Sequence, residues 1–251
     1  MSIQVHVLPI LSDNYVFAIT DSISGKAAVV DPGEFPTVEE FLVKQKLELT
    51  DIFITHQHSD HIGGVSDLVT KYRPKVYAPV QVHKHLNVEC RRVNEGDVLN
   101  LFGLSVGVLN VEGHTLGHVA YDFSELKSVF VGDVLFGLGC GRIFEGDYEM
   151  TFNSLKKIKA LPEEYKVYCA HEYTKMNMEF VKKLMSERLV DSCPGPEDFQ
   201  QYEMEFAEQI KSIGRSVPLA LRRELKVNPF LLAPTCDEFA KVRMLRNSFK
   251  I

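Results

Sequence analysis

The chain has 251 residues, of which 45% are hydrophobic and 25% charged, with 28 Lys and Arg against 34 Asp and Glu. This composition is that of a globular protein with a sizeable core, which excludes disordered and fibrous classes. The formal net charge of −6 argues against nucleic acid as a partner, because phosphates attract basic surfaces.

No stretch approaches the roughly 18 consecutive apolar residues of a membrane-spanning helix, so no membrane partner is expected. The first residues lack the basic segment and apolar core of a secretory signal. The five cysteines are scattered without CxxC pairs, which is typical of reduced thiols. These features predict a cytoplasmic protein.

The first half of the chain alternates short β-rich segments with turns, whereas β signals nearly vanish after residue 173. We predict strands at residues 3–8, 15–20, 26–31, 51–54, 75–78, 98–101, 104–111, 119–123, 128–131 and 166–170. We predict helices at residues 38–46, 65–72, 149–160, 176–189, 198–213, 219–226 and 236–247. The pattern predicts an α/β domain over residues 1–172 and a helical C-terminal domain over 173–251.

Three of the nine histidines fall within the sequence THQHSDH at residues 55–61. His56, His58, Asp60 and His61 follow a predicted buried strand and precede a predicted helix. Imidazoles at positions i and i+2 of such a loop can point to the same side. Four nitrogen and oxygen ligands exceed the needs of one tetrahedral site with an open position, so they favour two metals side by side.

Further ligand candidates follow other strands. His114, Asp133 and His171 each come just after a predicted strand and beside a small residue, as expected where several loops converge on one site. A single histidine at a strand end is more often a hydrogen-bonded structural group, but the 55–61 cluster favours metal binding for these positions. His118 is interpreted as a structural or supporting residue. No supporting context surrounds His6, His83 and His85.

Together, THQHSDH, GHTLGH, GDVLF and the late strand-end histidine resemble the metallo-β-lactamase superfamily. This resemblance implies a four-layered αβ/βα sandwich with a dinuclear metal site at one edge. Within the superfamily the chain most resembles the glyoxalase II, or hydroxyacylglutathione hydrolase, family. The supporting segments are DNY at 13–15, DPG at 31–33, GCGR at 139–142, AHEYT at 170–174, NPF at 228–230 and R-x-x-R-x-x-F at 243–249.

The resemblance also implies roles for individual residues. The first metal would be bound by His56, His58 and His114. The second would be bound by Asp60, His61 and His171, with Asp133 bridging both. The substrate-binding residues would be Arg142, Tyr173, Arg243 and Arg246, with Asn177 a weaker candidate. A His and Asp ligand set suits zinc, iron or manganese, and zinc is the first expectation.

Two departures from the family pattern affect the substrate site. Phe144 stands where some members carry a Tyr that hydrogen-bonds glutathione. Arg142 and Arg246 stand where other members carry Lys. The positive charge is the same, but Arg offers several N–H donors from a planar guanidinium, whereas Lys offers one compact ammonium group. Arg243 and Arg246 are three residues apart on a predicted helix, so they can present one cationic surface to a carboxylate.

The implied activity is hydrolysis of S-(2-hydroxyacyl)glutathione thioesters by a dinuclear metal-bound hydroxide. S-lactoylglutathione would give D-lactate and glutathione, the second step of methylglyoxal detoxification. Asp60 and Asp133 are the expected catalytic carboxylates, with Asp60 also orienting the nucleophile. The thiol that corresponds to the leaving group has a pKa of about 8.5, so the thiolate can leave without a strong general acid.

Other features of the sequence fit this chemistry. No GxSxG sequence occurs, and Cys140 and Cys169 are interpreted as packing residues. The alternative is a mononuclear iron persulfide dioxygenase of the same fold. A nucleic-acid-processing hydrolase and a non-catalytic metal-binding module are further alternatives. We expect a monomer that acts on a small-molecule glutathione thioester.

Overall fold

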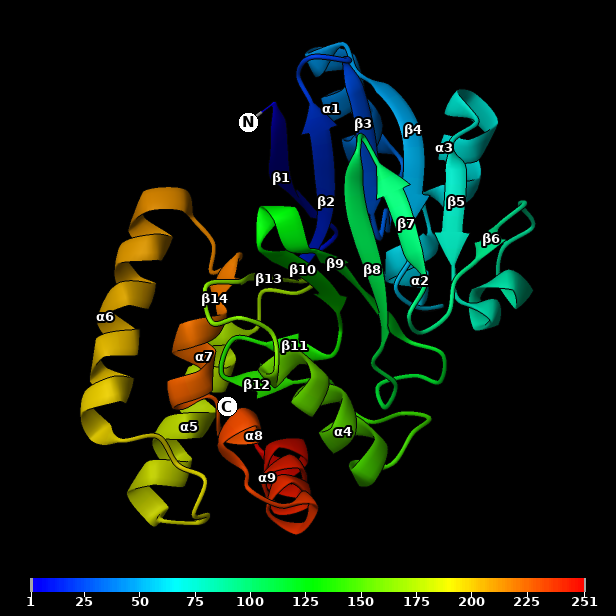
Figure 1. Cartoon of the computed structure of the whole chain (residues 1–251). Helices are drawn as coiled ribbons and strands as arrows, with labels where there is room; N and C mark the ends of the chain where they lie inside the picture. Colours follow the sequence, from blue (N-terminus) through cyan, green and yellow to red (C-terminus); the bar gives the residue numbers. More distant parts are fainter. Residues whose placement is uncertain (1, 251) are drawn as a thin grey trace.

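The computed structural model describes residues 2–250 and consists of two six-stranded sheets with helices on their outer faces (Figure 1). In the first sheet the strand order follows the chain. Its strands are β1 (Ile3–Ile10), β2 (Asn14–Asp21), β3 (Lys26–Val30), β4 (Glu48–Phe53), β5 (Lys75–Ala78) and β6 (Arg91–Arg92). Strands β1 to β3 pair antiparallel, and β3 to β6 pair parallel.

The second sheet has the order β14-β13-β10-β9-β8-β7. Its strands are β7 (Val98–Leu101), β8 (Leu104–Asn110), β9 (Val119–Phe123), β10 (Ser128–Gly132), β13 (Lys166–Cys169) and β14 (Leu219–Ala220). β10 and β13 are parallel, so their carboxyl ends lie at the same edge. A separate hairpin, β11 (Leu135–Phe136) and β12 (Gly139–Cys140), follows β10.

The helices flank these sheets. In chain order they are α1 (Pro36–Gln45), α2 (Ser59–Ile62), α3 (Val65–Tyr72), α4 (Tyr148–Lys159), α5 (Thr174–Glu187), α6 (Pro196–Ile213), α7 (Leu221–Val227), α8 (Pro229–Leu232) and α9 (Cys236–Ser248). Two 3-10 turns, η1 (Val80–Lys84) and η2 (Ser124–Leu126), complete the described elements.

Strand β2 shows how the sequence builds the layers. Its side chains point alternately to the two faces of the first sheet, and both faces are buried. Val16 and Ala18 pack in a cluster with apolar residues of α1 and α3, whereas Phe17 and Ile19 pack in the larger cluster that includes the second sheet. The continuous apolar run of β2 therefore reflects a strand covered on both sides.

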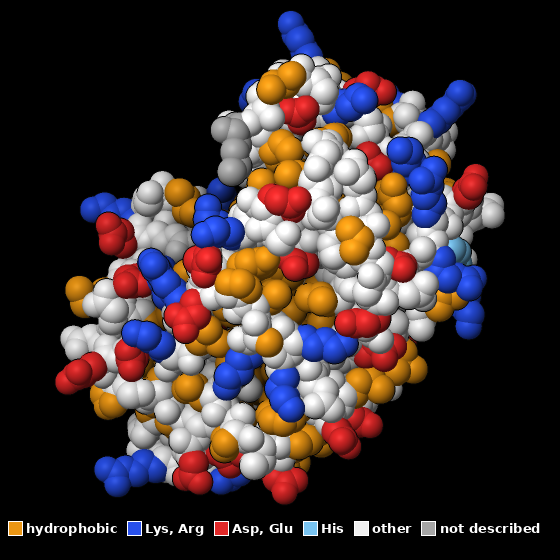
Figure 2. All heavy atoms as spheres, in the orientation of Figure 1, with side chains coloured by type: hydrophobic (Ala, Val, Ile, Leu, Met, Phe, Trp, Pro, Cys, Tyr) orange, Lys and Arg blue, Asp and Glu red, His pale blue; other side chains and the backbone are white. Residues whose placement is uncertain are grey.

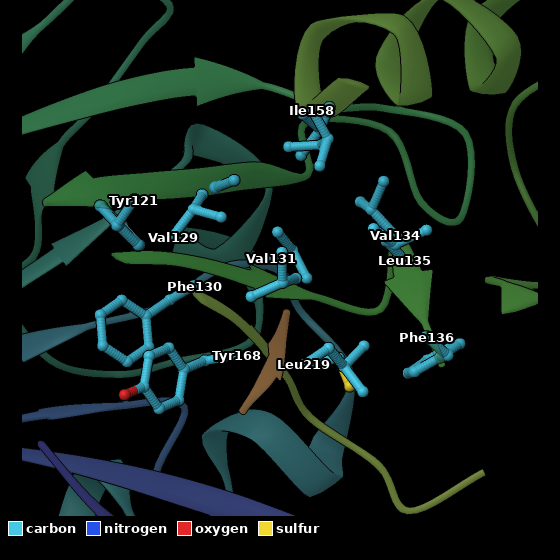
Figure 3. Close-up of a cluster of buried hydrophobic side chains, with 14 of the residues drawn as sticks. Tyr121, Val129, Phe130, Val131, Val134, Leu135, Phe136, Ile158, Tyr168 and Leu219 are labelled. Carbon is cyan, nitrogen blue, oxygen red and sulfur yellow. The ribbon is translucent and has the colours of Figure 1, made fainter. Parts of the chain in front are cut away.

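Aromatic side chains fill part of the space between the sheets. Phe130 and Tyr168, on adjacent strands β10 and β13, stack with ring centroids 4.8 Å apart (Figure 3). Phe17 of the first sheet reaches Phe130 at 5.4 Å. These contacts hold the two sheets together through buried apolar area.

The fourth layer is helical. Leu155 and Ile158 of α4, Phe180 of α5 and Phe230 of α8 are buried in the same large cluster as the strands of the second sheet. The predicted four-layered αβ/βα sandwich with a helical C-terminal region is confirmed.

One predicted helix begins later than expected. The sequence predicts a helix over residues 219–226, but Leu219 and Ala220 pair with Val167 and Lys166 to form the edge strand β14. Propensity alone did not indicate this strand because it depends on pairing with β13. The division into domains at residue 172 stays a prediction, and β14 joins the two parts through one sheet.

Within residues 2–250, no helix is long and apolar enough to cross a membrane. Figure 2 shows basic and acidic side chains interspersed over one face of the molecule. This face therefore offers no extended surface of a single charge.

The Asp-Pro-Gly turn at residues 31–33 lies against the loop of the histidine motif. A Cβ atom added to Gly33 would overlap the backbone carbonyl of Asp60 and lie 2.9 Å from Ile10 Cδ1. The turn can approach the motif this closely only because residue 33 has no side chain.

Replacing Gly33 with Ala is expected to displace the Asp60 backbone, lower stability by roughly 1–3 kcal/mol and weaken metal binding. Denaturant unfolding and metal competition with a chelator measure both effects. Gly107→Ala is the matched control, because its nearest new contact would be an ordinary 3.6 Å. Equal behaviour of the two variants would contradict the close-approach argument.

Candidate dinuclear metal centre and substrate cavity

All seven predicted ligand side chains lie together at one edge of the sandwich. They form one group of His56, His58, His114 and Asp133 and a second group of Asp60, His61 and His171. Within each group the candidate ligand atoms lie within 4.8 Å of one another.

Asp133, which directly follows β10, lies between the two groups. Its Oδ2 is 3.2 Å from His114 Nε2 and 3.4 Å from His171 Nε2. Its Oδ1 is 3.5 Å from His61 Nε2. A single carboxylate therefore faces imidazoles of both groups, as the predicted bridging role of Asp133 requires.

The loop after β4 places the histidine motif. Thr55 and His56 are fully buried, and His58 occupies the N-terminal boundary of the short helix α2, which carries Asp60 and His61. The loop is anchored because the Thr55 N–H and hydroxyl donate to the two carboxylate oxygens of Asp31 at 2.8 and 2.7 Å. The strand-to-helix turn thus distributes neighbouring residues between the two groups.

Three of the histidines are oriented through their second ring nitrogen. His61 Nδ1 contacts Asp31 Oδ2 at 3.0 Å, and His171 Nδ1 contacts Asp13 Oδ1 at 2.8 Å. His114 Nδ1 donates to the backbone carbonyl of Arg142 at 2.7 Å. Such contacts fix the tautomer and leave Nε2 free to bind a metal.

Sequence reasoning had missed the roles of Asp13 and Asp31. It also missed Asn14, whose Nδ2 donates to Asp60 Oδ2 at 2.8 Å. In the sequence, the segments 13–15 and 31–33 indicate only the family resemblance. The signal in the sequence is that Asp13 and Asp31 are carboxylates next to the ends of strands β2 and β3.

His118 lies outside both groups, consistent with its interpretation as a supporting residue. Its buried ring stacks on His56 with centroids 4.5 Å apart, and its Nε2 accepts from the Asp133 N–H at 3.2 Å. A Cβ on Gly132 would lie 2.8 Å from the His118 ring. His118 therefore packs between the backbone of Asp133 and the first group.

The electrostatics fit a pair of cations. Burial and the nearby His61 and His118 hold the pKa of His56 well below its usual value, so its imidazole is neutral and able to act as a ligand. Burial opposes ionisation of Asp133, but His61 and the hydrogen bonds from His114 and His171 hold its pKa well below the usual range.

Buried ligand atoms without hydrogen-bond partners also favour bound cations. Asp133 Oδ1 and His61 Nε2 are buried without a hydrogen-bond partner among the described residues. Burial opposes protonation of His171, but Asp133 and Asp60 raise its pKa to about 11, which shows how strongly this corner attracts positive charge. The donor set therefore fits two divalent cations.

A cavity of about 560 Å³ opens beside the metal-binding groups. His58, Asp60, His114, Asp133 and His171 border it, so it reaches both groups. The predicted substrate residues that line it are Arg142, Tyr173, Asn177, Arg243 and Arg246. Lining residues that were not predicted as substrate contacts are Phe136, Cys140, Phe144, Met176, Asn247 and Phe249.

The arginines in this cavity differ in their contacts. Arg243 is only 5% exposed, and it donates to the Cys140 carbonyl at 2.8 Å and to Asn247 Oδ1 at 3.1 Å. Arg246 is half-buried and donates through Nε to Asn177 Oδ1 at 3.0 Å. Arg142 is exposed at the rim. Arg246 and Arg142 are therefore freer than Arg243 to contact a ligand.

The predicted packing cysteines are both buried, and burial raises the pKa of each thiol. Phe144 is exposed beside the first group, with ring centroids 5.2 Å from His114 and 5.7 Å from His58. An apolar ring, with no hydroxyl group, thus borders this side of the cavity.

Residues 11–171 match the family model of the metallo-β-lactamase superfamily, a range that contains every predicted metal ligand. The chain is 44% identical over 244 residues to a hydroxyacylglutathione hydrolase of Bdellovibrio bacteriovorus, and the match covers 97% of each chain. The chain belongs to the hydroxyacylglutathione hydrolase family. This match covers nearly the whole chain and so extends beyond the superfamily domain into the C-terminal helices.

Solved structures share the fold of this family member. The crystal structure of ETHE1 from Myxococcus xanthus has a TM-score of 0.70 at 24% identity and covers 98% of this chain and 91% of that chain. The crystal structure of TTHA1623 in a di-iron-bound form has a TM-score of 0.58 at 28% identity and covers 67% of this chain and 91% of that chain.

Replacing Asp31 with Ala should weaken metal binding on the order of 10–100-fold, because His61 loses the contact that orients it and the motif loop loses its anchor at Thr55. Competition with a chromogenic chelator measures the affinity. Asp51→Ala is the control, since Asp51 is also a buried carboxylate but contacts Thr50. Unchanged affinity in the Asp31 variant would contradict the orienting role.

Proposed function

We propose that this protein hydrolyses S-(2-hydroxyacyl)glutathione thioesters and converts S-lactoylglutathione to D-lactate and glutathione, the second step of methylglyoxal detoxification. The observation that carries the proposal is a single cavity that joins the His and Asp cluster to Arg142, Arg243 and Arg246. The name of the Bdellovibrio bacteriovorus relative supports the same reaction.

The proposed ligands of one metal are His56, His58 and His114. Those of the other are Asp60, His61 and His171, with Asp133 shared. Two divalent cations, when bound, supply Lewis acidity that lowers the pKa of water and polarises a carbonyl. We propose zinc, with iron and manganese as the alternatives that the same ligand set accepts.

Asp60 has a separate part in the proposed reaction. Its side chain is about one-third exposed and borders the cavity, and Asn14 holds its Oδ2. Hydrogen bonds from His171 and Asn14 and the nearby His61 outweigh burial and keep the Asp60 pKa below its usual range. An ionised carboxylate in this position can accept a hydrogen bond from the attacking water. This contact would direct a lone pair of the water oxygen toward the thioester carbon.

The cationic end of the cavity, formed by Arg142, Arg243 and Arg246, suits the glutathione moiety. Glutathione carries two carboxylates, and guanidinium groups bind carboxylates with charge-assisted hydrogen bonds. Arg142 and Arg246 offer such groups, and Tyr173, which also lines the cavity, stacks on His171 with ring centroids 4.9 Å apart. Binding at this end would place the thioester beside Asp60.

A mononuclear iron dioxygenase would use only one metal. It would leave the second ligand group and the cationic end of the cavity without a role. We further propose a cytoplasmic monomer that does not bind nucleic acid. The net charge of −6 and the mixed charges on the face shown in Figure 2 support the last part of this proposal.

Metal analysis and activity assays test the proposed chemistry. The purified protein should hold about two metals per chain and hydrolyse S-lactoylglutathione, as followed by loss of thioester absorbance. A chelator should abolish the activity, and added metal should restore it. One iron per chain, with oxygen uptake on glutathione persulfide and no thioester loss, would support the dioxygenase instead.

Replacing Arg246 with Ala should raise KM for S-lactoylglutathione roughly 10- to 100-fold and change kcat less. The reason is that a remote carboxylate contact contributes nearly equally in the ground and transition states. Lys241→Ala is the control, because Lys241 is an exposed cation on the same helix that does not line the cavity. An unchanged KM in the Arg246 variant would remove this residue from the site.

A further inference from the structure

The β11–β12 hairpin forms the cavity wall between the metal-binding groups and the C-terminal helices. Its residues Phe136 and Cys140 line the cavity. Leu138, at the tip, is fully buried and has a φ of 57°, a left-handed conformation that is uncommon outside glycine. Such a conformation persists only where the surroundings hold it.

Side chains from the C-terminal helices hold the backbone of this hairpin. Each residue from 136 to 140 has a backbone N–H or carbonyl hydrogen-bonded to one of these side chains. The hydrogen bonds are Asn228 Nδ2 to the Phe136 and Gly139 carbonyls (3.1 Å each), Asn177 Nδ2 to the Gly137 carbonyl (2.9 Å), the Leu138 N–H to Glu224 Oε2 (2.8 Å) and Arg243 to the Cys140 carbonyl (2.8 Å).

Glu224 and Asn228 differ from the other two anchors because they do not line the cavity. They are 1% and 0% exposed, lie one helical turn apart and are hydrogen-bonded to each other at 3.0 Å. Tyr202 donates to Glu224 Oε1 at 2.7 Å, and Asn228 Oδ1 accepts from the Phe230 N–H. Burial raises the pKa of Glu224, so placing a carboxyl group here carries a cost.

We propose that Glu224 and Asn228 are positioning residues that set the distance between the thioester and the cationic end of the cavity. By fixing the hairpin, they make the cavity selective for glutathione thioesters over thioesters of shorter thiols. This inference rests on the proposed function and deepens it by explaining how the cavity selects its thiol. Neither Glu224 nor Asn228 lines the cavity, so both would act through the hairpin.

The metal end of the same segment is anchored separately. The Gly141 N–H donates to the Val134 carbonyl at 3.1 Å, and the Phe144 N–H donates to the His114 carbonyl at 3.1 Å. Loosening the hairpin tip should therefore disturb the glutathione end while the metal ligands stay in place. This separation distinguishes a positioning role from a general structural one.

Two substitutions at Glu224 separate hydrogen bonding from charge. Glu224→Leu removes the acceptor for the Leu138 N–H. Glu224→Gln keeps an amide oxygen for Leu138 and Asn228, and its NH₂ can donate to the Tyr202 oxygen. The Gln variant should therefore rescue the function lost in the Leu variant.

Asn228→Asp supplies an independent variant should Glu224→Leu fail to fold. The Asp side chain keeps the acceptor that caps α8 at Phe230 but places a carboxylate oxygen against the Phe136 and Gly139 carbonyls. Tyr202→Phe is the matched control, since it removes a buried hydrogen bond from Glu224 and leaves the contact to Leu138 intact.

The experiment compares kcat/KM for S-lactoylglutathione with that for S-lactoyl-N-acetylcysteamine, which lacks both glutathione carboxylates. In Glu224→Leu and Asn228→Asp the ratio of the two values should fall about 10-fold or more, through a higher KM for S-lactoylglutathione. Metal content should equal that of the unsubstituted protein. Glu224→Gln and Tyr202→Phe should keep the original ratio.

The proposal is overturned if both substrates lose activity equally, if metal is lost, or if Glu224→Gln behaves like Glu224→Leu. A Tyr202→Phe variant with the same altered ratio would also overturn it. Failure of the unsubstituted protein to hydrolyse S-lactoylglutathione would instead refute the proposed function, and this outcome is visible without any variant.

Discussion

The site depends on one buried carboxylate shared between two sets of imidazoles. Asp133 follows directly after β10, and its oxygens face His114, His171 and His61. An ionised carboxylate at such depth requires compensating positive charge. The fold meets this requirement by ending β4, β8, β10 and β13 near one edge, where each following loop contributes a ligand.

The supporting contacts extend this arrangement outward. Asp31 both anchors the loop at Thr55 and orients His61, so one side chain holds the motif and sets its ligand. The Arg142 carbonyl orients His114 just beyond the hairpin that Glu224 and Asn228 hold. Residues 133–142 thus border both the metal-binding end and the proposed glutathione end of the cavity, and the hydrogen bonds of Gly141 and Phe144 hold the metal-binding end separately.

The sequence alone predicted the features that depend on residues close together in the chain. The 55–61 motif and the strand-end positions of His114, Asp133 and His171 require only that strands end at a common edge. It could not predict contacts between residues far apart, such as Asp13 with His171, which are 158 positions apart. The sequence also showed no sign of β14, a two-residue strand that exists only through its pairing with β13. Nor did it indicate that Arg243 donates a hydrogen bond to the Cys140 carbonyl. These features follow from tertiary packing, which leaves little trace in local propensity.

The central claim is that Asp133 joins two metals next to a glutathione-binding cavity. Anomalous diffraction from metal-loaded crystals grown with glutathione tests it most directly. The account predicts two anomalous peaks, one in each ligand group with the Asp133 carboxylate between them, and glutathione density beside Arg142 and Arg246. A single peak among His56, His58 and His114, with the second group making only protein contacts, would contradict it.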